Sequence, residues 1–361
     1  MSPDPEMLAW LRLGLVAGLT SSGFRKLLAV HSTPEAICET DRATLARIVA
    51  DDVAAAIARG PDPERLEAAR RWLENSANHV VTLADKAYPR LLLEITDPPP
   101  LLYVTGNPDL LNRQSLAVVG SRNATPQGRA NAQAFSRELS EGGFTIVSGM
   151  ALGIDTAAHL GGLAGASSSI AVVGTGLDIV YPARNRDLAH RLADEGALVS
   201  EFALGTPALA SNFPRRNRLI SGLSRGCLVV EAALMSGSLI TARHALEQGR
   251  EVFAIPGSIH SPLSKGCHLL LKQGAKLAEN SQDILEELSG AIGERSAFAG
   301  ASDGTPEENP LLTALGFDPL DFDALCQRSG LTPDSASAML LTLELEGVVS
   351  RLPGGRFQRV R

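Results

Sequence analysis

Residues 115–128 read SLAVVGSRNATPQG, in which an apolar run leads into a glycine-containing loop. The run Leu-Ala-Val-Val before Gly120 shows no alternation of polar and apolar side chains, as expected for a strand that is buried on both faces of a sheet. The stretch PQGRANAQAFSRELS, which begins at Pro126, is typical of a helix. A buried strand, a loop and a helix in this order predict one unit of a parallel sheet covered by helices.

The same unit recurs between about residues 76 and 290. Helical stretches such as SLITARHALEQG (238–249) separate further short apolar runs. These runs are FTIVSG (144–149), SIAVVG (169–174), ALVSE (197–201), CLVVEA (227–232) and EVFAIPG (251–257). Strands that alternate with helices predict an α/β fold with a doubly wound, Rossmann-like parallel sheet, whose ligands bind outside the carboxyl ends of the strands.

Residues 1–75 are predicted to form a separate, all-helical domain. Apolar residues recur through MLAWLRLGLV, and the turn GLTSSG (18–23) separates them from FRKLLAV. Two short helices around a glycine-containing turn resemble a helix-hairpin-helix or SAM-like unit. In such units the amides of the turn can bind phosphate, and Arg25 and Lys26 lie nearby. The alternative is a domain that serves only for packing.

Residues 291–310 are small, polar and acidic, which predicts a linker. Residues 311–361 then show a helix, a turn, a second helix and a two-stranded hairpin, the order of a winged helix-turn-helix. Thr332 is expected to cap the second helix and Pro333 to begin it.

The second helix of this C-terminal domain has no side chain suited to reading DNA. Residues 333–346, PDSASAMLLTLELE, contain no Arg, Lys, Asn or Gln, and their only charges are acidic. A helix that reads the major groove uses such residues. The domain is therefore predicted to act through protein contacts, or through weak attraction of DNA to the wing cations Arg351, Arg356, Arg359 and Arg361; a vestigial packing module is the alternative.

The composition indicates an ordinary cytoplasmic protein. Four cysteines without a CxxC pair argue against a zinc site and fit a reducing compartment. The start MSPDPEM lacks the features of a secretory signal, and no run of about 18 apolar residues predicts a membrane span. Aromatic residues make up 4% of the chain, which argues against a broad surface for base stacking.

The formal net charge of −7 hides a basic segment. Between Gly205 and Ala275 there are eight Lys or Arg against three Asp or Glu, a balance of +5. The segment includes FPRRNR (213–218). Arg122, the cluster around Arg215, Ser238 and Lys265 all lie on loops that follow a strand and open a helix. Helix N-termini and guanidinium groups favour phosphate. A row of such loops along one edge suits a polymer better than a single nucleotide.

Catalytic and cofactor sites have weaker support. Neither the loop at Gly120 nor GTGLDIVYP (174–182) completes the GxGxxG pattern of a dinucleotide site. Asp155 and His159, four residues apart on one helix face, allow either catalysis or a structural role. The same choice holds for three carboxylates near strand ends, which are Asp178, Glu201 and Glu231.

Several of these segments together resemble the DprA/Smf family, the DNA-processing proteins of bacterial transformation. The segments are GSRNATPQG, SGMALGIDTAAH, GTGLDIVYP, FPRRNRLISGLS, VEAALMSGSLITARHALEQGREVFAIPGS and KGCHLLLKQGA. The resemblance implies an extended Rossmann-like domain that binds single-stranded DNA without known catalysis. Neither a metal nor a cofactor is expected. It also implies dimerisation through that domain, protection of incoming DNA, and loading of RecA past single-strand binding protein.

By motif, the resemblance assigns DNA binding to a defined set of residues. The set is Gly120, Ser121, Arg122, Phe213, Arg215, Arg216, Asn217, Arg218, Ser238 and Lys265. His268 departs from the family pattern, which usually has Asn there. The role of that amide is therefore in doubt in this chain.

A related fold suggests the main alternative, a LOG-type nucleotide phosphoribohydrolase. Its pattern, PGGxGTxxE, ends in a glutamate near the sugar. The nearest run here, SGSLITARH (236–244), ends in His244 and breaks the glycine pair. This argues against hydrolysis of a nucleoside bond. A third class, the sequence-specific transcription factor, would depend on the winged helix alone.

Overall fold

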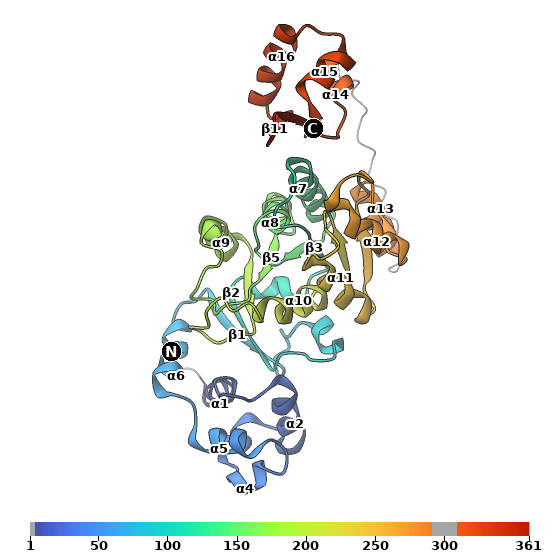
Figure 1. Ribbon diagram of the computed structural model, residues 1–361. Coiled ribbons are helices and arrows are strands. Elements are labelled where there is room, and N and C mark those ends of the chain that lie inside the picture. Colours follow the sequence, from blue (N-terminus) through green and yellow to red (C-terminus); the bar gives the residue numbers. More distant parts are fainter. Residues whose placement is uncertain (1–3, 291–308, 361) are drawn as a thin grey trace.

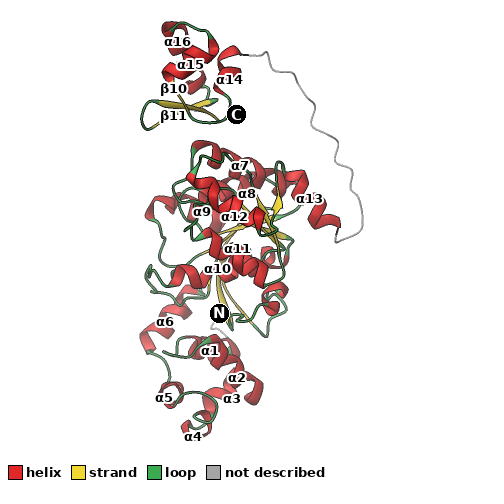
Figure 2. Ribbon diagram, turned by 45° about the vertical axis from the view of Figure 1, so that its right-hand side comes forward, coloured by secondary structure: helices red, strands yellow, loops and turns green. Residues whose placement is uncertain are grey.

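A nine-stranded sheet forms the centre of the computed structural model, which describes residues 4–290 and 309–360. A helical N-terminal domain and a small C-terminal domain lie at opposite ends of this central domain (Figures 1 and 2). The strand order is β1-β2-β6-β5-β4-β3-β7-β8-β9.

Seven strands of the sheet are parallel and carry the doubly wound topology. They are β3 (Ser115–Val119), β4 (Thr145–Ser148), β5 (Ser169–Val172), β6 (Ala197–Ser200), β7 (Gly226–Val229), β8 (Glu251–Ala254) and β9 (Lys276–Leu277). The strands β1 (Asn78–Thr82) and β2 (Leu101–Gly106) extend one edge as an antiparallel pair. The predicted parallel sheet is confirmed, and this edge pair adds an element that the pattern of apolar runs did not indicate.

Both faces of the sheet are covered by helices, as the unbroken apolar runs predict. Along β3, Leu116 and Val118 pack beneath α7 (Pro126–Glu141), α8 (Ile154–Ala164) and α13 (Ser281–Gly290). The alternate residues Ala117 and Val119 join the opposite core, beneath three other helices. These are α10 (Asn212–Gly222), α11 (Ser238–Glu247) and α12 (Lys265–Lys272).

Shorter elements complete the central domain. They are α9 (Arg186–Glu195) and the 3-10 helices η1 (Arg90–Glu94), η2 (Pro108–Asn112), η3 (Ala183–Asn185) and η4 (Pro262–Ser264). Within the described residues, no helix is both long enough and apolar enough to cross a membrane.

The N-terminal domain has six helices, of which the first five pack around a core that includes Trp10, Phe24, Leu27 and Ile37, while the sixth packs with Leu11 against β1 and β2. They are α1 (Pro5–Gly14), α2 (Ser21–His31), α3 (Pro34–Glu39), α4 (Arg42–Leu45), α5 (Asp51–Arg59) and α6 (Pro63–Trp72). Thr20 caps α2, because its hydroxyl accepts a hydrogen bond from the Gly23 amide at 3.1 Å. The glycine-containing turn thus leads directly into a helix start.

The C-terminal domain has the order of a winged helix. It comprises α14 (Pro310–Leu315), β10 (Leu320–Asp321), α15 (Phe322–Ser329), α16 (Pro333–Leu345), β11 (Val349–Leu352) and β12 (Arg356–Arg359). Thr332 caps α16 through the Ser335 amide, as the sequence predicts. Residues 291–308 of the expected linker lie outside the described residues, and its last two residues, Asn309 and Pro310, already begin α14.

Candidate nucleic-acid interface

The topology of the sheet creates a crevice at the carboxyl ends of β3 and β7. From β3 the strand order runs outward through β4, β5 and β6 on one side and through β7, β8 and β9 on the other. Ligands of doubly wound sheets bind where the order reverses in this way. A cavity of about 760 Å³ opens at this point. Its lining includes Gly120, Ser121, Arg122, Phe213, Arg216, Asn217 and Ser238.

Close packing fixes the loop that follows β3. The Ser121 amide donates to the Glu231 carbonyl at 2.7 Å, which ties the loop to the end of β7. A Cβ atom at Gly120 would lie 2.6 Å from Ile154 Cγ1 and 2.9 Å from that carbonyl oxygen. Only glycine therefore allows the loop to pass so close to its neighbours.

Glu231 holds this loop with its side chain as well. Its carboxylate accepts from the Thr125 amide at 3.0 Å and from the Thr125 hydroxyl at 2.6 Å. Thr125 in turn caps α7 through the Gly128 amide at 2.9 Å. These contacts support the structural interpretation of Glu231 and leave its oxygens occupied.

An aromatic pair lines the cavity. The rings of Tyr181 and Phe213 have their centroids 5.4 Å apart, and the Arg122 guanidinium carbon lies 5.9 Å from the Phe213 centroid. Tyr181 is 48% exposed, so its ring is accessible to a ligand. The sequence analysis quoted Tyr181 within GTGLDIVYP but did not assign it a role. Two rings beside a guanidinium are the kind of surface on which an unpaired base can stack.

The arginines of FPRRNR point in two directions. Arg216 is buried at 4% exposure, and its Nη1 donates to the Val172 carbonyl at 2.7 Å. Its Nε is buried without a hydrogen-bond partner among the described residues, and the residue is part of the cavity lining. Burial lowers the pKa of Arg216 to about 10, partly offset by the charge of Asp155, so the guanidinium stays charged at neutral pH.

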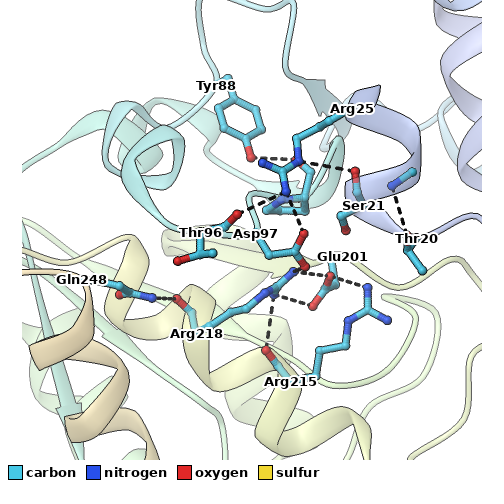
Figure 3. Close-up of polar contacts among 12 residues, drawn as sticks. Thr20, Ser21, Arg25, Tyr88, Thr96, Asp97, Glu201, Arg215, Arg218 and Gln248 are labelled. Carbon is cyan, nitrogen blue, oxygen red and sulfur yellow. Dashed lines mark hydrogen bonds and ion pairs between the residues drawn. The ribbon is translucent and has the colours of Figure 1, made fainter. Parts of the chain in front are cut away.

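Arg215 and Arg218 lie on the other side of α10, toward Glu201 (Figure 3). Arg215 pairs with this carboxylate at 3.0 Å and Arg218 at 2.8 Å. The sequence grouped both arginines with the DNA-binding set. The structure places them in an ion-pair network on the face of α10 opposite to Phe213, Arg216 and Asn217.

Of the last two expected residues, Ser238 lines the cavity, whereas Lys265 is not among the residues that line it. The Ser238 hydroxyl is 2.7 Å from the Ser236 hydroxyl at the start of α11. Lys265 is exposed at the start of α12, where its ammonium donates to the Ile259 carbonyl. His268, one turn further, donates from Nε2 to the Gly257 carbonyl at 3.0 Å. The imidazole thus holds the same loop.

Two family models match the chain. The family described as DNA recombination-mediator protein A matches residues 79–289, and the DprA winged helix domain matches residues 296–355. The chain is 45% identical to Protein Smf of Escherichia coli over 298 residues, which are 80% of this chain and 80% of that protein.

The chain belongs to the DprA family.

Two solved DprA structures resemble the fold of this chain. The X-ray structure of DprA from Streptococcus pneumoniae superposes with a TM-score of 0.69 at 38% identity, over 80% of this chain and 99% of that one. A DprA structure from Helicobacter pylori, described for its single-stranded DNA binding mode, has a TM-score of 0.54 at 31% identity. It covers 59% of this chain and 97% of its own.

Asp155 and His159 support the backbone of this DprA-family site. Asp155 accepts from the Gly149 and Ala151 amides at 3.1 and 3.3 Å. His159 accepts from the Met150 amide through Nε2 at 3.2 Å, so its Nδ1 donates to Ser169 Oγ at 2.7 Å. Together they hold Met150 at a φ of 56°, a conformation that L-residues rarely adopt.

These contacts favour the structural role for both residues. Burial lowers the pKa of His159 to about 3, so the ring is neutral at pH 7. Asp178 likewise accepts from the Gly205 amide at 2.9 Å. In the part of the chain that the structure describes, no group of three His, Cys, Asp or Glu side chains is placed to hold a metal ion.

Proposed function

We propose that this DprA-family protein binds single-stranded DNA without catalysis, along the carboxyl ends of β3 and β7. The observation that carries this proposal is the cavity at the switch point. There a buried guanidinium, the N-termini of α10 and α11, and two aromatic rings meet. Cationic groups and helix N-termini bind phosphate, and the rings accept unpaired bases.

The proposed contacts divide between backbone and bases. Arg122 and Arg216 would bind phosphates with the loop at Gly120 and Ser121, and Ser238 and Lys265 would extend the track along the rim. Phe213 and Tyr181 would stack on bases, while Asn217 would bind from the first turns of α10. Arg215 and Arg218 would contribute from the opposite face of α10, where they form ion pairs with Glu201. The single-stranded DNA binding mode described for DprA from Helicobacter pylori supports this proposal from a relative.

The wider role follows the family. We propose that the protein acts in the cytoplasm, protects incoming DNA during transformation or recombination, and loads RecA onto it in exchange for single-strand binding protein. We also propose a homodimer formed through the central domain. The last strand of the described sheet, β9, exposes Leu277 at 48%, and the neighbouring α12 exposes Leu269 at 38%. An exposed sheet edge has unpaired backbone groups that can pair with another chain.

The test is titration of labelled oligonucleotides into the pure protein, followed by fluorescence anisotropy over a range of salt. Single strands should bind more tightly than duplexes, with little sequence preference. The plot of log affinity against log salt should be linear, with a slope of about −0.7 per phosphate neutralised. Arg122→Ala and Lys265→Ala should each weaken binding to all sequences alike.

A matched control removes a cation far from the cavity. Arg137, which pairs with Glu141 at 3.4 Å on α7, is 59% exposed and should tolerate Ala without loss of affinity. Tight binding that depends on one sequence and ignores salt would contradict the proposal. So would release of free base from nucleoside monophosphates, which would instead favour a phosphoribohydrolase.

A further inference from the structure

A chain of five charged side chains joins the N-terminal domain to the helix that lines the cavity (Figure 3). Arg25 of α2 pairs with Asp97 at 3.1 Å and donates to the Thr96 carbonyl at 3.2 Å. Asp97 also pairs with Arg218 of α10 at 3.5 Å. Glu201 then joins Arg218 to Arg215. Positive and negative groups therefore alternate from one domain to the other.

Glu201 is the most constrained member of this network. Its side chain is 2% exposed, and that of Arg218 is 12% exposed. Arg218 binds it with two parallel hydrogen bonds, from Nη1 to Oε1 and from Nη2 to Oε2, both 2.8 Å long. Such a bidentate pair fixes direction as well as distance. Breaking one partner of a buried pair leaves an uncompensated charge.

The network and the cavity use different faces of one helix. Arg215 and Arg218, three residues apart, share the face toward Glu201. Phe213, Arg216 and Asn217 line the cavity. Residues three or four apart share a helix face. A rotation of α10 that changes the ion pairs on one face therefore also moves the cavity-lining side chains on the other face.

We infer that Glu201 and Asp97 are positioning residues for the DNA site. They hold α10 through Arg215 and Arg218 in the orientation that presents Phe213 and Arg216 to the ligand, and Arg25 extends this control to the N-terminal domain. The inference rests on the proposed function and deepens it: the helical domain contributes to DNA affinity through α10.

Charge and position predict opposite results for the substitution Glu201→Gln. Coulomb repulsion between a carboxylate and phosphate should fall, so charge alone would strengthen DNA binding. Loss of positioning should instead weaken it by roughly tenfold, the effect that losing a supporting partner has at metal sites. We expect the weaker binding. The salt slope should not steepen, because no phosphate contact is gained, and it should become shallower if the displaced Arg216 loses its phosphate.

A gain in affinity on Glu201→Gln would be recognised from the salt dependence. If Arg215 and Arg218, once released, bind phosphate themselves, affinity will rise and the salt slope will steepen by about 0.7 for each new contact. That outcome, or an unchanged affinity, overturns the inference. Glu201→Asp keeps the charge and should lie between the wild type and Glu201→Gln.

Asp97→Asn provides a second test in case Glu201→Gln fails to fold. The Asp97 side chain is 42% exposed, so its neutral form should be tolerated. It should still weaken binding severalfold, since Arg218 loses one of its two carboxylates. Thermal unfolding of each variant shows whether it is folded at the temperature of the titration.

The contribution of the N-terminal domain is tested by two charge-matched substitutions. Arg25→Gln cuts the network at its first member. Arg42→Gln removes an equal charge from the same domain, where Arg42 pairs with Asp51 in an exposed contact. We expect only Arg25→Gln to weaken binding, and equal effects would contradict the coupling.

Arg122→Ala separates this inference from the proposed function. If Arg122→Ala leaves binding intact, the proposed DNA site itself is wrong. If Arg122→Ala weakens binding while Glu201→Gln does not, the site stands and the positioning role fails.

Discussion

The guanidinium of Arg216 lies against Gly149, where an added Cβ atom would be 1.9 Å from Nη1. The absence of a side chain at Gly149 therefore makes room for the buried cation. Gly149→Ala should displace Arg216 and weaken single-stranded DNA binding. In a double-mutant cycle, Gly149→Ala should add little to Arg216→Ala, because both act on one group. Additive losses in affinity would show that Gly149 acts by another route.

The aromatic pair predicts a contribution that requires bases. Tyr181→Ser should reduce affinity for an ordinary oligonucleotide by about 1–3 kcal/mol if its ring stacks on one base. The same substitution should have little effect on an abasic oligonucleotide of equal length, which keeps the phosphates. Anisotropy titrations of the two probes measure the difference. Equal losses on both probes would assign Tyr181 a role in packing.

The buried imidazole predicts a loss of stability in acid. The pKa of His159 is about 3 in the folded protein, against an ordinary value of 6.5. Between these values the unfolded chain binds more protons, so the free energy of unfolding should fall as the pH drops below 6.5. The slope approaches about 1.4 kcal/mol per pH unit for one proton.

His159→Gln should flatten this pH dependence, measured by denaturant unfolding at several pH values. Two charged groups face the same region. Arg216 acts in the same direction as burial, by lowering the pKa of His159. Burial raises the pKa of Asp155, so protonation of Asp155 favours the folded state near the acidic end of the range. An unchanged slope in His159→Gln would assign the acid sensitivity to other groups.

The winged helix is expected to contribute little to DNA binding. Its helix α16 exposes Leu341 at 60% and Leu345 at 82%, and the charges on or beside it are acidic. Deletion of residues 305–361 should leave single-strand affinity within a few-fold of the full chain. Tight, sequence-dependent binding of a duplex by residues 305–361 alone would show that this domain reads DNA.

The fold was largely predictable because parallel strands leave a strong pattern. Residues 116–119 are apolar without a break, and the structure buries them on both faces. The antiparallel edge pair β1 and β2 was not predicted. The residues of Asn78–Thr82 carry no local signal for the strand with which they pair. Its partners lie at Leu101–Gly106 and, through them, in β6.

The sequence indicates which loops surround the candidate site, but it does not indicate in which direction their side chains point. FPRRNR indicates an anion-binding helix start. Only the packed structure shows that Glu201, fourteen residues before Arg215, forms ion pairs with Arg215 and Arg218. Tyr181 meets Phe213 because two separate loops converge. Asp155 and His159 have the spacing of a pair, but their hydrogen bonds go largely to the backbone between Gly149 and Ala151.

Glu231 has a consequence for the thermodynamics of binding. By joining the loop after β3 to the end of β7, it orders the mouth of the cavity before any ligand arrives. The conformational entropy of that loop is therefore lost during folding, and little remains to be lost on association. A flexible polymer such as single-stranded DNA loses conformational entropy when it binds. Because the cavity wall is already ordered, this loss in the DNA is the principal entropic cost of binding.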